Sequence, residues 1–259
     1  MGRRFGQHFL ARQSVLERIA RAACPEHCDL LLEIGPGRGA LTLHLLEHAS
    51  RVVAIEIDPV LVQYLRSKFR ERQNLEIVDN DILKADLSSY GPLTVVGNLP
   101  YYITSPIIQK VLALGPQLAH AVFLVQKEVA ERLTASPGTR DYGYLSVQTQ
   151  LLSKAELLFT VPAAAFRPPP KVDSALVRLT PRPELPVADP AAFLQFASAA
   201  FHQKRKTLRN NLLGSYEKDI LDALPETKQR AEQLSINELI ALWESLTPSF
   251  THPTPPSGP

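Results

Sequence analysis

The fold is decided by Leu30-Leu31-Leu32-Glu33-Ile34-Gly35-Pro36-Gly37-Arg38-Gly39, a short apolar run that leads directly into a glycine-rich loop. The apolar run predicts a buried strand, and a helical pattern begins after the last glycine. Glycines let the backbone approach a bound ligand closely, and the start of the next helix offers N–H groups without a helical partner. The stretch therefore predicts a strand, a ligand-binding loop and a helix.

An acidic residue follows at the distance that a nucleoside cofactor requires. The next predicted strand, Arg51 to Ile57, carries Glu56 near its end, where a carboxylate binds the two hydroxyls of a ribose. The third glycine of the loop comes one residue early for a dinucleotide site, which favours S-adenosylmethionine over a nicotinamide cofactor. The candidate cofactor contacts on these two segments are Gly35, Gly37, Glu56 and Ile57.

A third predicted strand, Leu75 to Val78, also ends in polar residues. It runs into Asp79-Asn80-Asp81-Ile82. A lone aspartate there is more often the cap of a turn, but the carboxyl ends of neighbouring strands meet where open α/β sheets bind ligands. We therefore expect Asp81 to accept a hydrogen bond from the adenine amino group of the cofactor, and Ile82 to pack on the adenine ring.

The tetrapeptide Asn98-Leu99-Pro100-Tyr101 points to methylation of an exocyclic amino group. It follows the apolar run Leu93 to Val96, so it lies at another strand end. The lone pair of such a nitrogen is delocalised into the base, and hydrogen bonds from both amino hydrogens would localise it. The Asn98 oxygen and a backbone carbonyl beside Pro100 can accept them, and Tyr101 offers a face on which the base stacks. All four residues are catalytic candidates, and Asn98 is also a candidate cofactor contact.

Three further blocks complete a resemblance that spans nearly the whole chain. They are Phe5-Gly6-Gln7-His8-Phe9-Leu10, the segment Phe166 to Ser174, and the segment Phe201 to Asn211. With the motifs above, they make the chain resemble the small-subunit ribosomal RNA adenine dimethyltransferases of the KsgA type. Many members of that family have asparagine at the positions of His8 and Tyr102.

The resemblance implies a fold, an activity and site residues. The expected fold is α/β: a Rossmann-like class I methyltransferase domain with a mixed, mostly parallel sheet, and a smaller all-helical domain after it. The implied activity is N6,N6-dimethylation of two adjacent adenosines near the 3′ end of small-subunit ribosomal RNA, with a role in subunit biogenesis. His8 and Leu10 carry over as cofactor contacts. Phe166 carries over as the residue that sandwiches the target adenine together with Tyr101.

Net charge does not explain RNA binding, because the chain carries only +2 over 259 residues, 45% of them hydrophobic. Binding must then rest on local basic patches. One patch lies at the amino terminus, and a denser one lies between His202 and Arg209. Phe201, Leu208 and Leu212 recur at helical spacing, which predicts a helix that is anchored on one face and presents cations to phosphates. The candidate RNA-binding residues are Arg3, Arg4, Lys204, Arg205, Lys206 and Arg209.

Cysteine usage and hydropathy narrow the class of protein further. Cys24 and Cys28 are the only cysteines, so we expect reduced thiols and no metal site, because a structural zinc ion needs about four ligands. No apolar stretch is long enough to span a bilayer, and no signal sequence is evident. We expect a soluble, cytoplasmic monomer whose partners are the small ribosomal subunit and its RNA.

The order of patterns predicts two domains. Apolar strands alternate with helical patterns through Gln126, and Asp58-Pro59 is a typical helix start. Glu156 to Val161 and Ala175 to Leu179 resemble closing strands, and three prolines after them suggest a linker. We predict a methyltransferase domain over residues 1–183, a helical RNA- or ribosome-binding domain over 187–247 and a disordered tail over 248–259.

Three alternatives stay open at this stage. A nicotinamide-dependent oxidoreductase shares the glycine loop and Glu56 but gives no role to Asn98-Leu99-Pro100-Tyr101. The antibiotic-resistance methyltransferases that act on large-subunit RNA share the first domain, although the block Phe201 to Asn211 resembles the small-subunit enzymes. A ribosome-assembly factor without chemistry is the third possibility, and cofactor titration and nucleoside analysis separate the three.

Overall fold

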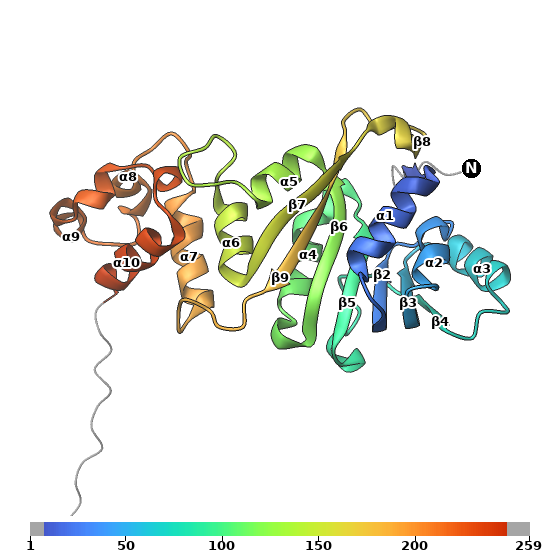
Figure 1. Cartoon of the computed structure of the whole chain (residues 1–259). Helices are drawn as coiled ribbons and strands as arrows, with labels where there is room; N and C mark the ends of the chain where they lie inside the picture. The colour runs from blue at the N-terminus through green and yellow to red at the C-terminus, as the bar shows by residue number, and fades with distance from the viewer. Residues whose placement is uncertain (1–7, 248–259) are drawn as a thin grey trace, which may run out of the picture. The chain divides into compact units, whose positions relative to one another are not determined.

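The computed structural model describes residues 8–247, and its largest element is one seven-stranded sheet (Figure 1). The strand order is β4-β3-β2-β5-β6-β9-β7, and only β9 runs against the other six. The strands are β2 (Cys28–Ile34), β3 (Ala49–Glu56), β4 (Leu75–Asp79), β5 (Leu93–Asn98), β6 (Leu118–Gln126), β7 (Ser153–Val161) and β9 (Ser174–Pro181). The prediction of a mixed, mostly parallel sheet is confirmed.

Helices alternate with the first strands of this sheet, as the order of patterns predicts. α1 (Gln13–Ala23), α2 (Ala40–Leu45) and α3 (Pro59–Lys68) precede β2, β3 and β4 respectively, and side chains of all three helices join one buried apolar cluster with Leu31, Val96 and Leu124 of the sheet. The other helices of this part are α4 (Thr104–Leu112), α5 (Lys127–Leu133) and α6 (Tyr144–Leu152). Because side chains alternate along a strand, Glu33 and Asn98 face the same side as Leu31 and Val96.

The chain reverses its direction of travel across the sheet between β2 and β5. It moves outward from β2 through β3 to β4 and then returns, so that β5 pairs with the free side of β2, with Ile34 opposite Gly97. At such a switch point the loops after the two strands diverge and leave a crevice at their carboxyl ends. The glycine loop and Asn98 therefore border the same crevice.

The helix start predicted at Asp58-Pro59 is confirmed, and a second helix of the chain also has a side-chain cap. Asp58 caps α3 through its side chain, which accepts a hydrogen bond from the Val60 N–H at 2.9 Å, and Pro59 occupies the first helical position. Ser235 and Glu238 form a capping box at the start of α10 (Ile236–Leu246). Such caps satisfy backbone N–H groups that have no partner inside the helix.

A small second sheet joins two segments that lie far apart in the sequence. β1 (Phe9–Leu10) pairs antiparallel with β8 (Phe166–Arg167), so that Leu10 lies opposite Phe166. The backbone N–H of Ala11 extends this contact by donating to the Ala165 carbonyl at 2.9 Å. The amino-terminal segment is therefore held beside the Pro-rich segment that follows β8.

The chain divides into two compact units, one of residues 1–135 and 148–184 and the other of residues 136–147 and 185–259. In its described part the second unit contains α7 (Pro190–Ala200), α8 (Leu208–Leu212), α9 (Lys218–Ala223) and α10, and Phe193 packs on Trp243 with ring centroids 5.7 Å apart. The sequence predicts that residues 136–147 are part of the first domain, which it extends over residues 1–183. They belong to the second, where Tyr142 is fully buried and contacts the ring of Phe201.

The basic block of the second unit does not form the predicted helix. α7 ends at Ala200, residues 201–207 form turns, and α8 begins only at Leu208, where the Thr207 side chain caps it. Threonine accepts from N–H groups at helix starts more readily than it continues a helix, and this preference interrupts the apolar spacing. Lys204, Arg205 and Lys206 thus lie on an irregular connection.

The two cysteines also differ from the expectation of separate thiols. Cys24 and Cys28 are paired in the structure, with their Cα atoms 5.8 Å apart, across the turn from α1 to β2. Within residues 8–247 no cluster of side chains suits a metal ion, and no helix in that range is long and apolar enough to cross a membrane.

Candidate active site

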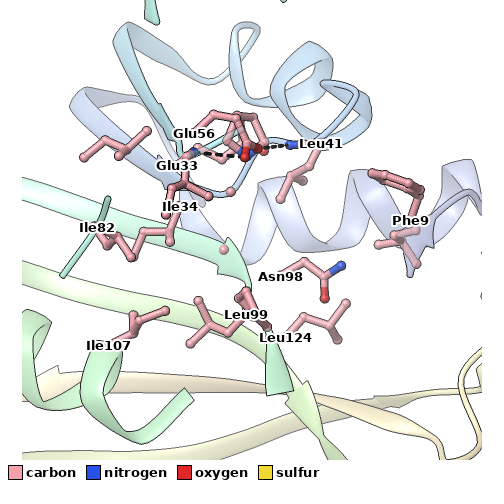
Figure 2. Close-up of a pocket in the computed structure, with 18 of the residues that line it drawn as sticks. Phe9, Glu33, Ile34, Leu41, Glu56, Ile82, Asn98, Leu99, Ile107 and Leu124 are labelled. Carbon is pink, nitrogen blue, oxygen red and sulfur yellow. Dashed lines mark hydrogen bonds between the residues drawn. The ribbon is translucent and has the colours of Figure 1, made fainter. Parts of the chain in front are cut away.

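One cavity of about 390 Å³ opens at the carboxyl ends of β2, β3 and β5 (Figure 2). Almost every cofactor-binding and catalytic candidate from the sequence lies on its wall, although these candidates come from five separate segments of the chain. They are His8, Leu10, Gly35, Gly37, Glu56, Ile57, Asp81, Ile82, Asn98, Leu99, Pro100 and Tyr101. Phe166 is the one cavity candidate that does not line it.

The glycine loop that follows β2 has a backbone conformation that residues with side chains rarely adopt. Gly35, Gly37 and Gly39 have φ angles of +65°, +59° and +72°. A Cβ atom on Gly37 would lie 3.0 Å from the ring of Phe9, and one on Gly39 would lie 2.5 Å from the ring of Phe69. Glycine at these two positions therefore lets the loop pack tightly between the amino-terminal strand and the end of α3 while it borders the cavity.

Glu56 sits at the end of β3 with its carboxylate anchored by backbone groups. It is 4% exposed, and it accepts hydrogen bonds from the N–H groups of Gly37, Ile57 and Asp58 at 3.0, 3.0 and 3.1 Å. Burial raises the pKa of the Glu56 carboxyl, and the three N–H groups oppose part of that rise. The side chain is thus held at the cavity wall, as Figure 2 shows for Glu56 beside Glu33.

Glu33 is a second buried carboxyl on this wall, and no sequence motif assigns it a function. It is 2% exposed, lies on β2 and accepts a hydrogen bond from the Thr42 hydroxyl at 2.6 Å. Burial raises the pKa of Glu33 to about 8, and the nearby Glu56 carboxylate adds to the rise while Lys68 opposes it. A charged residue inside the otherwise apolar run Leu30 to Ile34 was the signal that could have identified it.

Replacing Glu33 with Gln should remove a large pH dependence of stability. The Glu33 carboxyl has a pKa of 4.5 in the unfolded chain and about 8 in the folded state, so between these two pH values the folded state keeps a proton that the unfolded chain has released. This difference in proton binding stabilises the folded state. The stabilisation is complete below pH 4.5 and is lost as the pH rises through about 8. Glutamine does not titrate, so the unfolding free energy of Glu33→Gln relative to wild type should rise over this range, by at most about 5 kcal/mol at about 1.4 kcal/mol per pKa unit.

Urea titrations across this pH range measure the effect. The matched control is Glu71→Gln, because the Glu71 side chain is 84% exposed and its replacement should leave the pH profile unchanged. Parallel profiles for wild type and Glu33→Gln would contradict a buried, protonated Glu33.

Asn98 ends β5 with its amide oriented by the amino-terminal segment. Its Nδ2 donates to the His8 carbonyl at 3.2 Å, and because a carbonyl can only accept, the Asn98 oxygen is left as the free acceptor. The backbone after it is equally constrained. Leu99 N–H donates to the Leu124 carbonyl at 3.0 Å, and the Pro100 carbonyl accepts from Ile103 N–H and the Thr104 hydroxyl.

These bonds decide which backbone carbonyl can act beside Asn98. The Pro100 carbonyl already has two donors, at 3.2 Å from Ile103 and 3.1 Å from Thr104, whereas no residue in the described range donates to the Leu99 carbonyl. A carbonyl that accepts two hydrogen bonds has no lone pair left for a substrate. The sequence left open which carbonyl beside Pro100 would serve, and the geometry favours Leu99.

Tyr101 contacts residues from both ends of the first unit's sequence. Its hydroxyl lies 3.3 Å from the Ser174 hydroxyl, and its ring is stacked with the imidazole of His8, with centroids 6.1 Å apart and planes 26° apart. The His8 Nδ1 lies 2.9 Å from the Pro168 carbonyl, which fixes that nitrogen as the donor. The Tyr101 ring is therefore fixed at the cavity wall by its contacts with Ser174 and His8.

Phe166 does not occupy the position that the resemblance implies. It is fully buried in the apolar cluster with Leu10, and it is not part of the cavity wall. The reason is the β1–β8 pairing, which covers Phe166 with the amino-terminal strand. A role as one side of an adenine sandwich is thus not supported by this structure.

At the opposite wall, Asp81 and Ile82 follow β4. Asp81 Oδ1 accepts from the Leu83 N–H at 2.9 Å, so the residue caps a turn as isolated aspartates often do. The same residue still lines the cavity, and Ile82 is 7% exposed beside it. The two therefore combine a polar group with an apolar surface, as the recognition of a purine requires.

Comparisons with known proteins show the family of the chain. A family model described as ribosomal RNA adenine dimethylase matches residues 1–247. The chain belongs to this family. It is 44% identical over 262 residues to the ribosomal RNA small subunit methyltransferase A of Acaryochloris marina, a match that covers 95% of the chain and 97% of that protein. It is 43% identical to the protein of the same name from Saccharophagus degradans, over 95% of the chain and 94% of that protein.

Solved structures extend the likeness of this adenine dimethylase to three dimensions. A dimethyladenosine transferase from Plasmodium falciparum superposes with a TM-score of 0.78 at 28% identity, over 91% of this chain and 96% of that one. The 23S rRNA methyltransferase ErmE superposes with a TM-score of 0.74 at 31% identity, over 92% of this chain and 99% of that one. The fold is therefore the Rossmann-like methyltransferase fold.

Adenine dimethylases of this family draw their methyl groups from S-adenosylmethionine, and the cavity has groups that suit it. Glu56 supplies two carboxylate oxygens for ribose hydroxyls, and the glycine loop supplies close backbone approach. The fit favours this cofactor over a nicotinamide dinucleotide, since Asn98-Leu99-Pro100-Tyr101 forms the remaining wall of the same cavity.

Proposed function

We propose that this protein transfers methyl groups from S-adenosylmethionine to the N6 nitrogens of two adjacent adenosines near the 3′ end of small-subunit ribosomal RNA. The observation that carries the proposal is the free acceptor pair formed by the Asn98 side-chain oxygen and the Leu99 carbonyl at the cavity wall. An exocyclic amino group has two hydrogens, and two fixed acceptors match it.

The residues of the chain act by holding and polarising the amino group. The Asn98 side-chain oxygen and the Leu99 carbonyl accept hydrogen bonds from its two N–H groups. These bonds move the nitrogen toward tetrahedral geometry and localise its lone pair. The cofactor supplies a methyl group on a sulfonium that is already reactive, so alignment at about 3–3.5 Å accounts for most of the catalysis. A general base is not required, since the proton can pass to water after transfer.

Tyr101 is proposed to hold the target adenine once it has left its stack in the RNA. Enzymes that modify a base atom extrude the base at a cost of a few kcal/mol, and aromatic contact offsets that cost. The imidazole of His8 is stacked with the Tyr101 ring. An adenine that stacks on the same face would displace only the His8 imidazole, whose hydrogen bond is to the Pro168 carbonyl, and would leave the His8 backbone carbonyl bound to Asn98.

The cofactor is proposed to lie between the glycine loop and the ends of β3 and β4. Glu56 would bind the ribose, Asp81 and Ile82 the adenine, and Asn98 the side nearest the reacting methyl group. The remaining proposed contacts are His8, Leu10, Gly35, Gly37 and Ile57, all of which line the cavity.

The second candidate is methylation of large-subunit RNA, which the likeness to ErmE supports. Small-subunit specificity is favoured because ErmE is 31% identical to this chain, whereas the small-subunit methyltransferases A of Acaryochloris marina and Saccharophagus degradans are 43–44% identical. Incubation with labelled S-adenosylmethionine and with each subunit from cells that lack the enzyme separates the two. Dimethyladenosine in the small subunit alone supports the proposal, and label in the large subunit alone overturns it.

The second unit is proposed to bind the ribosomal RNA, and only part of its basic block is free to do so. Lys204 donates to the Arg140 carbonyl and lies 3.7 Å from Glu232, and Arg209 forms an ion pair with Asp222. Arg205 and Lys206 are exposed and have no ion-pair partner in the described range. Arg3 and Arg4 lie outside the described residues.

Replacing Arg205 and Lys206 together with Ala should weaken RNA binding and flatten its salt dependence. Each phosphate that the protein no longer neutralises makes the slope of log K against log salt shallower by about 0.7–0.9, so the slope of the double variant should be shallower by about 1.5. The control is Lys204→Ala, which removes a cation that is already paired with Glu232 and the Arg140 carbonyl and should change the slope by less. An equal change for both variants, measured by filter binding to small-subunit RNA, would contradict this division.

Action on an assembling small subunit implies that the protein works in the cytoplasm, and we propose that it does so as a monomer. Sedimentation at the concentrations of the activity assay tests the monomer.

A further inference from the structure

Tyr102 is a large aromatic side chain that lines the cavity and yet is 66% exposed. Its neighbour Tyr101 is held by Ser174 and His8, but the hydroxyl and ring of Tyr102 contact no hydrogen-bonding or aromatic partner in the described range. A single exposed aromatic ring is ordinary on a protein surface. What distinguishes Tyr102 is its place on the cavity wall, where its free ring is available to a ligand that enters the cavity.

The backbone at Tyr102 is constrained even though its side chain is free. Residues Tyr101–Ile103 form a single 3-10 turn, which runs into α4 at Thr104. Thr104 and Ile103 both donate to the Pro100 carbonyl and so close the turn. With three residues per turn, successive side chains point about 120° apart, so Tyr101 and Tyr102 point in different directions although both line the cavity, and Tyr102 is the more exposed of the two.

A basic segment lies beside the same mouth. His8 binds the Pro168 carbonyl, and Tyr101 contacts Ser174, so the segment 168–174 is fixed near its start and at its end next to two cavity residues. Lys171 and Asp173 are exposed within this segment, and Arg167 is exposed directly before it. One nitrogen of the Arg167 guanidinium donates to the Ala164 and Phe166 carbonyls, and no partner in the described range is bound to the other two. Cations beside an exposed aromatic ring are the usual composition of a surface for single-stranded nucleic acid.

We infer that Tyr102 is a second base platform, which stacks on the nucleotide next to the adenosine in the cavity while Arg167 and Lys171 contact the flanking phosphates. The inference rests on the proposed function. A single-stranded RNA that delivers one base into the cavity must pass its mouth, where Tyr102 is the exposed ring. When two adjacent adenosines are both substrates, Tyr102 holds one of them while the other reacts.

The test compares Tyr102→Ala with Tyr102→Phe in the full-length protein, with Tyr64→Ala as the matched control. Tyr64 is an exposed tyrosine, 47% accessible, that does not line the cavity. The probe is a single-stranded RNA with the sequence around the two adenosines, either intact or lacking the base next to the target on its 5′ or 3′ side. Binding is measured with S-adenosylhomocysteine present.

Tyr102→Ala should bind the intact RNA about 5- to 150-fold more weakly, the ratio expected when one stacked base loses its aromatic partner, whereas Tyr102→Phe and Tyr64→Ala should bind like wild type. Removing the base on one side of the target should weaken RNA binding by wild type by the same factor. It should leave RNA binding by Tyr102→Ala unchanged, because the two changes remove the same interaction. The affinity of Tyr102→Ala for S-adenosylmethionine should stay at the wild-type value.

Two results would overturn the inference in distinguishable ways. If wild type methylates the small subunit but Tyr102→Ala binds every RNA like wild type, or loses affinity equally with and without each neighbouring base, Tyr102 is no base platform and the proposed function still stands. If wild type methylates no ribosomal adenosine, the proposed function fails and the inference fails with it. The inference and the proposed function together predict that Tyr102→Ala releases more subunits dimethylated at only one of the two adenosines than wild type does.

Discussion

Replacing Asn98 with Ala should lower the rate of methyl transfer by about 100- to 1000-fold, the range found when one fixed hydrogen-bond partner of a reacting group is removed. The variant loses the side-chain acceptor and keeps the Leu99 carbonyl, so the amino nitrogen is held through one hydrogen only. Single-turnover transfer from labelled S-adenosylmethionine to the small subunit measures the loss directly and separates it from product release.

The cofactor affinity of Asn98→Ala should stay within a few-fold of wild type, because Glu56 and the glycine loop carry most of the proposed cofactor contacts. Asn98 also donates to the His8 carbonyl, so the variant should lose about 1 kcal/mol of stability in a denaturant titration. A large loss of cofactor binding with normal transfer at saturation would mean that Asn98 acts mainly on the cofactor. That result would reassign the residue.

Local patterns predicted the cavity because its wall is built from strand ends. The glycine loop, Glu56 and Asn98 each follow a recognisable apolar run, and parallel strands deliver their ends to one edge of a sheet. The cap and proline at Asp58-Pro59 predicted the start of α3 for a simpler reason, since both act within one turn.

Contacts between distant segments were not predictable in this way. Phe166 is covered because Leu10 pairs with it from 156 positions earlier, a pairing that no local pattern encodes. Lys204 donates a hydrogen bond to the Arg140 carbonyl. Arg140 lies in residues 136–147 of the second unit, and the chain passes through the first unit again, over residues 148–184, before it reaches Lys204. Both corrections arise from tertiary partners, and each changes which side chains remain free for RNA.

Glu33 shows a different limit. Its position in an apolar run marks it as unusual, but its state depends on Thr42, on the Glu56 carboxylate and on the depth of burial, all of which follow from the packing of α2 and β3 against β2. Sequence indicates that such a residue is present, and only the structure gives the charge that it carries.

Replacing Glu56 with Ala should weaken the binding of S-adenosylmethionine by about 100-fold or more. Hydrogen bonds to a charged group contribute about 1.5–3 kcal/mol each, and this carboxylate is proposed to bind two ribose hydroxyls while three backbone N–H groups hold it in place. At saturating cofactor the transfer rate should recover, since Glu56 is not proposed to contact the adenosine of the RNA. Isothermal titration measures the affinity, with Glu76→Gln, an exposed glutamate of β4, as the control.

The pH dependence of cofactor binding distinguishes the charge of the Glu56 carboxylate from its shape. Burial raises the Glu56 pKa, so the acceptor form is present above the raised pKa and is lost as the pH falls through it. Wild-type affinity should therefore decline on the acid side. Glu56→Gln keeps the size of the side chain but places an amide N–H₂ among backbone donors, so its affinity should be lower at neutral pH and independent of pH on the acid side. A variant that declines in parallel with wild type would assign the titration to another group, and Glu33 on the same wall is then the residue to replace next.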